Sequence, residues 1–228
     1  MLDTLFSQFD SIIVFDIETT GIDHKNDEII ELAALQMERG PLGAPMIRDE
    51  FDLLIRLSPG RELPREIVEL THITPDMLAA EGVEKAAAAR RLAGMLQSCE
   101  RPLLVAYNAQ FDLCFVYYFL AAHGWAHLLK KVKMLDALTV YKDRRPYPHK
   151  LLHAIEAYGV SAENTHRAID DTKAAFEVLC AMEAECADLE RYINLFGYNP
   201  KYGASGPKIS SIRYVPQPYR MSGKLYEQ

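Results

Sequence analysis

Two acidic residues interrupt an apolar run near the start of the chain, in the segment VFDIETTG at residues 14–21. Side chains in a β-strand alternate between its two faces, so Asp16 and Glu18 project from the same face. Two neighbouring carboxylates repel each other, and taking them out of water adds a further cost unless positive charge compensates them. A divalent cation is the usual compensation, so this spacing predicts a metal-dependent reaction.

Two further aspartates occupy positions where an open sheet presents functional groups. Asp112 lies in AYNAQFDLCF, just after an expected strand, and Asp171 lies in HRAIDDTKAAF, where a long helix begins. Both positions are beyond strand ends and at helix starts. Taken singly, each aspartate has a structural explanation, because the helix dipole favours an acid in the first turn. Only the complete set of acids points to chemistry.

The three acidic segments together carry a family resemblance. In order, FDIETTG, NAQFD and HRAIDDT match the three exonuclease motifs of the DEDD superfamily, and the histidine five residues before the last aspartate matches its DEDDh branch. The chain resembles the DnaQ-like (epsilon) proofreading exonucleases of bacterial replicative DNA polymerases, from about the first strand to the long helix. The resemblance implies an α/β, ribonuclease H-like fold with a central mixed β-sheet flanked by helices.

The resemblance also implies a catalytic set, comprising a general base and four ligands for two divalent metal ions. The base is His166, and histidine is the side chain that changes its charge near neutral pH. The implied metal ligands are Asp16, Glu18, Asp112 and Asp171. Ligands that offer only oxygen favour Mg²⁺ or Mn²⁺. Asp170 adjoins Asp171, but the family spacing from the histidine selects Asp171.

Further residues are expected to contact the 3′ nucleotide. The turn after the paired acids contributes Thr19, Thr20 and Gly21, although a plain structural turn explains them equally well. The segment LTHITPDM resembles the family's TGIT segment, with His72 in place of the usual glycine, which leaves Thr71 and Ile73 as contacts. Beside Asp112, the expected contacts are Asn108 and Phe111. Phe111 suits base stacking or a place in the core.

Apolar patterns place these residues on specific elements. Strands are expected at residues 11–18, 28–37, 50–57, 102–108 and 131–135, the first three forming an antiparallel meander because their connections are short. Helices are expected at residues 64–71, 75–81, 83–98, 111–124, 135–143, 149–159 and 170–193. Strands followed by alternating helices and strands predict an α/β layered domain.

The composition changes after residue 193. Residues 194–228 are rich in Gly, Pro and Tyr and hold five basic residues against one acidic residue, whereas the whole chain carries a net charge of −7. We therefore divide the chain into an exonuclease domain at 1–193 and a basic C-terminal tail at 194–228. The tyrosines of the tail suit single-stranded nucleic acid, a protein partner, or packing on the domain, and the sequence does not rank these roles.

The motifs favour a 3′–5′ exonuclease that releases nucleoside monophosphates from single-stranded or frayed 3′ ends of DNA. An RNA 3′–5′ exonuclease similar to ribonuclease T or oligoribonuclease has the same acids and histidine, because the two differ in contacts to the 2′-hydroxyl. A third hypothesis is a binding module that has lost the chemistry. The presence of all four acids and the histidine argues against it.

The cysteines and the lengths of the apolar stretches predict the cellular compartment. The four cysteines form no CxxC pair and no zinc-finger spacing, so we expect reduced thiols in the cytoplasm. The N-terminus does not resemble a signal peptide, and no apolar stretch is long enough for a membrane span. We expect no membrane partner. A polymerase is a candidate protein partner, because the resemblance is to proofreading exonucleases.

Overall fold

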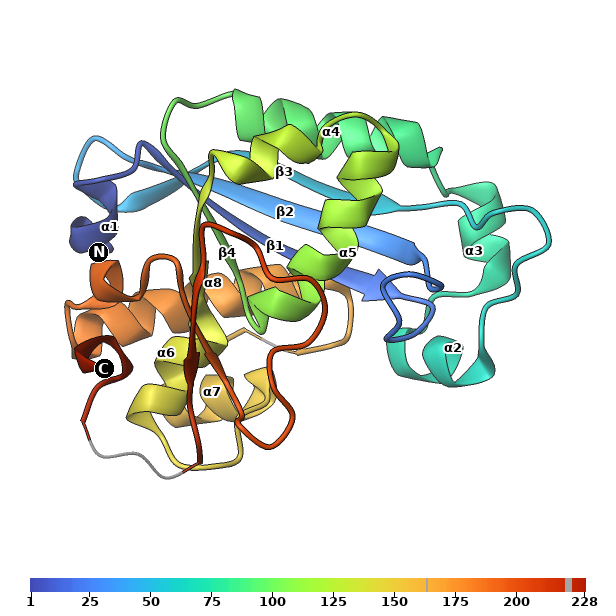
Figure 1. The fold of residues 1–228 in the computed structure, drawn as a ribbon. Coiled ribbons are helices and arrows are strands. Elements are labelled where there is room, and N and C mark those ends of the chain that lie inside the picture. The colour runs from blue at the N-terminus through green and yellow to red at the C-terminus, as the bar shows by residue number, and fades with distance from the viewer. Residues whose placement is uncertain (163, 220–222) are drawn as a thin grey trace.

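A five-stranded mixed sheet forms the centre of the computed structural model, which describes residues 1–162, 164–219 and 223–228 (Figure 1). Its strand order is β3-β2-β1-β4-β5. The strands are β1 (Ser11–Thr19), β2 (Ile29–Arg39), β3 (Pro45–Leu54), β4 (Pro102–Ala106) and β5 (Lys133–Asp136). The first three pair antiparallel, as expected, while β4 and β5 run parallel to β1. The carboxyl ends of β1, β4 and β5 therefore meet at one edge of the sheet.

The helices lie where the sequence patterns predict them, with boundaries shifted by a few residues. They are α2 (Arg65–Thr71), α3 (Pro75–Ala80), α4 (Lys85–Gln97), α5 (Ala109–Ala122), α6 (Ala137–Arg144), α7 (Leu151–Tyr158) and α8 (Ala168–Glu185). The patterns do not predict three short elements, α1 (Asp3–Phe6), η1 (Ala126–Lys130) and η3 (Leu225–Glu227). Within the described residues, every helix is too short or too polar to cross a membrane.

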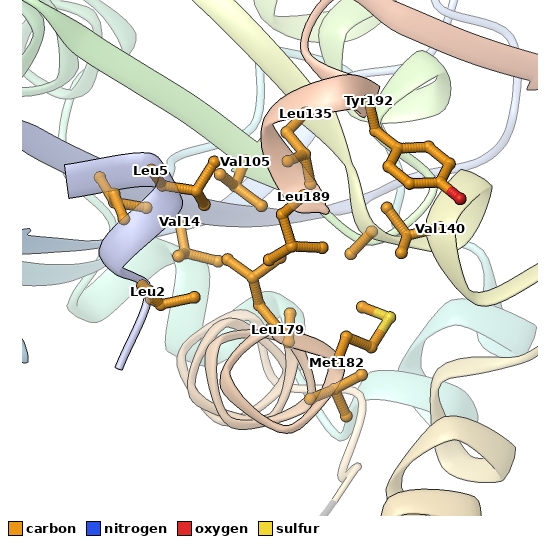
Figure 2. Packing of buried hydrophobic residues seen from close by; sticks show 14 of the residues in the cluster. Leu2, Leu5, Val14, Val105, Leu135, Val140, Leu179, Met182, Leu189 and Tyr192 are labelled. Carbon is orange, nitrogen blue, oxygen red and sulfur yellow. The ribbon is translucent and has the colours of Figure 1, made fainter. Parts of the chain in front are cut away.

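Each face of the sheet carries its own hydrophobic core. On one face, α6, α7 and α8 cover alternate residues of the strands, and Figure 2 shows Val14 and Val105 packed against Leu179. On the other face, α4 and α5 cover the residues between them, such as Ile13 and Phe15. Because the alternation continues along β1, Asp16 and Glu18 follow the face of Val14. The face that presents the paired acids is therefore the face covered by α8.

The expected helix at 170–193 is wrong in its last third. Helix α8 ends at Glu185, and a separate 3₁₀ helix η2 (Leu189–Tyr192) follows it. The guanidinium of Arg144, which is almost fully buried, donates hydrogen bonds to the carbonyl oxygens of Met182 and Cys186 and pairs with Asp188. These carbonyls belong to the last turn of α8 and its cap, so a distant arginine satisfies the helix end. Local periodicity carries no sign of such a partner.

The C-terminal tail packs on the body rather than extending from it. Strands β6 (Leu195–Tyr198) and β7 (Arg213–Pro216) form a two-stranded parallel sheet. Phe196 is buried in the core on the α5 side, and Leu225 is buried in the core on the α8 side. The tail thus supplies side chains to both hydrophobic cores.

We expect Phe196→Ala to destabilise the whole fold. Only 2% of this side chain is exposed, so truncation should lower the free energy of unfolding by about 3–5 kcal/mol. Tyr202→Ala is the matched control, because Tyr202 is a tail aromatic that is 72% exposed. Urea denaturation followed by circular dichroism measures both variants. Equal midpoints for both would mean that the tail is not part of the core.

Candidate active site

A cavity of about 530 Å³ brings together residues from distant parts of the chain. Seven of the residues predicted from sequence line it: Asp16, Glu18, Asn108, Phe111, Asp112, His166 and Asp171. They come from β1, from the start of α5 and from the segment that leads into α8. Five others do not line it: Thr19, Thr20, Gly21, Thr71 and Ile73. The cavity therefore unites every predicted catalytic residue and part of the predicted substrate contacts.

Three of the predicted catalytic side chains lie close enough to share one ion. Glu18, His166 and Asp171 each offer a donor atom, and these atoms all lie within 4.8 Å of one another. Asp16 and Asp112 line the same cavity, and Asp112 is almost fully buried. The cavity thus brings four carboxylates together with the imidazole of His166.

Burial and mutual repulsion penalise the charged form of these carboxylates. Burial, followed by the charges of Asp112, Glu18 and Asp171, raises the pKa of Asp16 well above its ordinary value. Burial and the neighbouring charges of Asp171 and Glu31 raise the pKa of Glu18 to about 8. Burial likewise raises the pKa of Asp112 and of Asp171. The cluster holds more acid than its surroundings neutralise.

A further acid, Glu31, fixes the start of α8. Glu31 lies opposite Glu18 in the register of β2 with β1 and is fully buried. It accepts hydrogen bonds from Arg167 Nε at 2.8 Å, from Arg167 Nη2 at 2.6 Å and from the backbone N–H of Ala168 at 2.8 Å. Because Arg167 immediately follows His166, this pair anchors the segment that carries the histidine. Sequence reasoning missed Glu31, although an acid inside the apolar run IIELAAL was a signal.

The loop before α8 orients Asp171 and His166. Asp171 accepts hydrogen bonds from Asn164 Nδ2 at 2.6 Å and from the backbone N–H of Thr165 at 3.2 Å. His166 is exposed and has a φ of 57°, a left-handed conformation that is uncommon for residues other than glycine. Asp170 accepts from Thr165 Oγ1 at 2.7 Å and does not line the cavity. The loop therefore presents Asp171, rather than Asp170, to the cavity.

Asp136 fixes the start of α5, as Glu31 fixes the start of α8. Its Oδ1 accepts hydrogen bonds from the backbone N–H groups of Asn108 and Ala109, each at 3.0 Å. Its Oδ2 accepts from Thr139 Oγ1 at 2.6 Å, so the same carboxylate caps α6. These bonds hold Asn108 in a left-handed conformation, with a φ of 70°, at the N-cap of the helix that carries Asp112. The sequence analysis did not single out Asp136.

The turn after β1 is built by its own hydrogen bonds. Thr19 Oγ1 donates to the carbonyl oxygen of Gly21 at 2.6 Å, and Thr20 Oγ1 donates to Asp27 Oδ1 at 3.1 Å. A Cβ at Gly21 would lie 2.4 Å from Asp27 Oδ2, so only glycine fits there without a shift of Asp27. The substrate contacts assigned to Thr19, Thr20 and Gly21 stay predictions.

Thr71 and Ile73 are fully buried at the end of α2. Thr71 Oγ1 donates to the carbonyl oxygen of Ile67 at 2.9 Å and accepts from the backbone N–H of Ile73 at 3.1 Å. Between them, His72 is the C-cap of α2 with a φ of 59°. This left-handed position favours glycine, which gives a physical reason for the glycine usual in the family motif. The nucleotide contacts of Thr71 and Ile73 stay predictions.

A family model described as Exonuclease matches residues 13–179, which include β1 and most of α8. The chain belongs to this exonuclease family. It is 34% identical over 194 residues to a DNA polymerase III PolC-type of Lacticaseibacillus paracasei and 36% identical over 174 residues to one of Clostridium perfringens. These matches cover 84% and 75% of this chain but only 12% and 11% of the relatives, so the chain spans about an eighth of their length.

Solved structures of exonucleases share the fold. The zinc-bound form of the E. coli exonuclease I complex with single-stranded DNA superposes with a TM-score of 0.68 at 20% identity, covering 81% of this chain and 43% of that one. An E. coli exonuclease I complex with a dT13 oligonucleotide gives a TM-score of 0.66 at 18% identity, covering 78% and 42%. The central mixed sheet flanked by helices is therefore the ribonuclease H-like arrangement predicted from the motifs.

The cluster of this exonuclease-family chain suits divalent cations. Carboxylate oxygens are the donors that Mg²⁺ and Mn²⁺ prefer, and His166 is the one nitrogen donor of the three-residue group. Burial, together with the neighbouring acids, raises the pKa of Asp16 and of Glu18, so their charged forms are penalised there. A cation would remove this penalty, so the donor set and the electrostatics both fit one.

We expect a divalent cation to stabilise the protein more at pH 8 than at pH 5.5. With a pKa of about 8 in the folded state, Glu18 binds more protons folded than unfolded from about pH 4.5 upward, so the stability of the metal-free protein falls as the pH rises through this window. A cation relieves a charge that is present only at the higher pH. Thermal unfolding with Mn²⁺ or with EDTA should show a rise in Tm about twofold larger at pH 8.

Glu18→Gln is the control for this pH dependence. The amide keeps the shape of the side chain and removes its charge, so the difference between the two pH values should shrink. An equal rise in Tm at both pH values in the unmodified protein would contradict a metal site at this cluster.

Proposed function

We propose that this chain is a metal-dependent 3′–5′ exonuclease that releases nucleoside monophosphates from single-stranded or frayed 3′ ends of DNA. The observation that carries the proposal is the single cavity lined by four carboxylates and His166. The choice of DNA is supported by the relatives, which are named DNA polymerase III PolC-type, and by exonuclease I, whose structures hold DNA. The same relatives support a DNA polymerase as a partner of the chain, and hence the cytoplasm as its location.

The positions of the residues support the roles that the resemblance implies. Asp16, Glu18, Asp112 and Asp171 would hold two divalent ions, Mg²⁺ or Mn²⁺. Such ions supply charge neutralisation at the reacting phosphate and a more acidic water. His166, exposed at the rim of the cluster, would accept the proton of the attacking water at an imidazole nitrogen. Glu31 and Arg167 act as positioning residues, because they fix the backbone on which His166 lies.

The proposed substrate contacts fall into two groups. Asn108 and Phe111 line the cavity, so we assign them to the 3′ nucleotide. The other assignments rest on the motif match alone, and they are Thr19, Thr20, Gly21, Thr71 and Ile73.

A product assay tests the activity and its substrate together. The protein is incubated with Mn²⁺ or Mg²⁺ and 5′-labelled single-stranded DNA or RNA of the same sequence, with EDTA as the control. A metal-dependent ladder that shortens from the 3′ end is expected, and it should form faster on DNA. A faster ladder on RNA would favour the RNA exonuclease, and no ladder on either substrate from folded, metal-loaded protein would support a binding module.

Asp171→Asn should lower the rate by at least about a hundredfold, because several kcal/mol of charge stabilisation correspond to two or more powers of ten. Asp170→Asn is the matched control. Asp170 lies outside the cavity, and an asparagine can still accept the hydrogen bond from Thr165, so its rate should stay within about threefold of the unmodified protein. The reverse order of the two variants would move the ligand assignment to Asp170. Steady-state hydrolysis of labelled DNA measures both.

His166→Ala should reduce kcat by about 10²–10⁴-fold, the usual contribution of a general base. A general base contributes to the pH dependence of the rate, so the pH–rate profiles of the two proteins should differ in shape. A pH–rate profile with the same shape in both proteins would remove His166 from the reaction.

A further inference from the structure

Three aromatic residues form one wall of the catalytic cavity, which we call the aromatic wall: Tyr147, His149 and Tyr219. Tyr219 stacks on His149 with ring centroids 6.1 Å apart and an interplanar angle of 13°. Tyr147 packs edge-on against both rings, at 5.8 Å from His149 and 5.4 Å from Tyr219. Two of these rings are unusually open to solvent, with Tyr147 69% and Tyr219 57% exposed. Exposed aromatic faces in a cavity are available to stack on a ligand.

The C-terminal tail brings Tyr219 to this place by an anchor two residues earlier. Gln217 is 3% exposed, and its Nε2 donates to the carbonyl oxygen of Thr139 at 2.9 Å. Its backbone N–H donates to the carbonyl oxygen of Tyr198 at 2.6 Å. Thr139 also accepts a hydrogen bond from the backbone N–H of Gly197, so both strands of the tail are fixed to α6. The tail therefore holds Tyr219 at the cavity.

His149 provides a firm base for the stack. It is 9% exposed, and its Nε2 lies 2.9 Å from the carbonyl oxygen of Arg145. Its own carbonyl oxygen accepts from the hydroxyl of Tyr107 at 2.9 Å. One hydrogen bond thus holds the ring under Tyr219 and another holds its backbone, while Tyr219 and Tyr147 keep open faces.

Two kinds of lining residue meet in the cavity. The carboxylate cluster comes from β1, α5 and the start of α8, whereas Lys142 and Lys150 line the cavity with the aromatic wall. Lysine ammonium groups suit phosphates, and aromatic faces suit unpaired bases of any sequence. A single strand of nucleic acid would use the acids, the lysines and the exposed rings of this one cavity together, which a protein partner would not.

We propose that the aromatic wall stacks unpaired bases on the 5′ side of the 3′-terminal nucleotide, with Lys142 and Lys150 at the phosphates between them. The inference rests on the proposed function and gives it a substrate class, a single strand of more than one nucleotide. A base-paired strand cannot offer a free face to the wall, so the tail residue Tyr219 contributes to selection of single strands.

Two substrates of different length distinguish base stacking at the aromatic wall from the hydrolysis step. Oligothymidylate reaches the wall, whereas the 5′-p-nitrophenyl ester of thymidine monophosphate carries only one nucleotide. Tyr219→Ala and Tyr147→Ala should each lower kcat/KM for oligothymidylate by about 5- to 100-fold. The loss on the ester should be much smaller, so the ratio of the two kcat/KM values should fall by at least about fivefold. Tyr219→Phe keeps the ring and should restore the ratio.

Tyr202→Ala is the matched control, because Tyr202 is an exposed tyrosine of the same tail that does not line the cavity. Its ratio of kcat/KM on oligothymidylate to kcat/KM on the ester should match that of the unmodified protein. Equal losses of Tyr219→Ala on both substrates would overturn the proposal, since the residue would then act through the catalytic cluster. Unchanged activity of Tyr219→Ala on oligothymidylate would overturn it as well.

A binding measurement tests the aromatic wall even if the protein hydrolyses neither DNA nor RNA. Fluorescence anisotropy of 5′-fluorescein oligothymidylate, measured with EDTA present, reports affinity without turnover. Weaker binding by Tyr219→Ala than by Tyr202→Ala would support the wall even in a protein that hydrolyses nothing. Equal binding by the two variants would overturn the wall, whatever the outcome of the product assay.

Discussion

The constraint on which this structure depends is the mutual repulsion of carboxylates that must lie together in a partly buried cavity. Asp16, Glu18, Asp112 and Asp171 come from three separate segments. Burial first, and then the charges of neighbouring acids, raise the pKa of Asp16 and raise that of Glu18 to about 8, so bringing these carboxylates together in their charged form is unfavourable. Asp171 accepts hydrogen bonds from Asn164 and Thr165, yet burial still raises its pKa. The surrounding fold must therefore hold the three segments in place, and two hydrophobic cores on either side of one sheet do so.

Two other carboxylates, Glu31 and Asp136, connect the cores to the cluster. Each accepts hydrogen bonds from residues at the start of a helix. These N–H and O–H donors compensate its negative charge, so the carboxylate can be buried at little cost. Glu31 ties the start of α8 to β2, which sets His166 and Asp171. Asp136 ties the start of α5 to the end of β5, which sets Asp112. Glu31 and Asp136, whose charges are compensated by hydrogen bonds, thus position the acids of the cluster.

The hydrogen bonds of Asp136 also connect to the C-terminal tail. Asp136 accepts the hydroxyl of Thr139, and Thr139 in turn bonds the backbone of Gly197 and the side chain of Gln217. A continuous series of hydrogen bonds therefore links the start of α5 to the segment that carries Tyr219. The tail, which differs from the rest of the chain in composition, contributes Tyr219 to the lining of the cavity that holds the four acids.

The sequence alone predicted the fold class and the main strands and helices, and it nominated four acids and a histidine that the structure brings to one cavity. These depend on local periodicity and on short motifs, in which spacing fixes which side chains share a face. It did not determine the end of α8, which depends on Arg144, or the roles of Glu31, Asp136 and Asn164. It also did not determine that Tyr219 lies beside His149, 70 residues earlier in the chain. Those features arise from hydrogen bonds and packing between segments far apart in the chain, and only the tertiary structure decides which donor meets which acceptor.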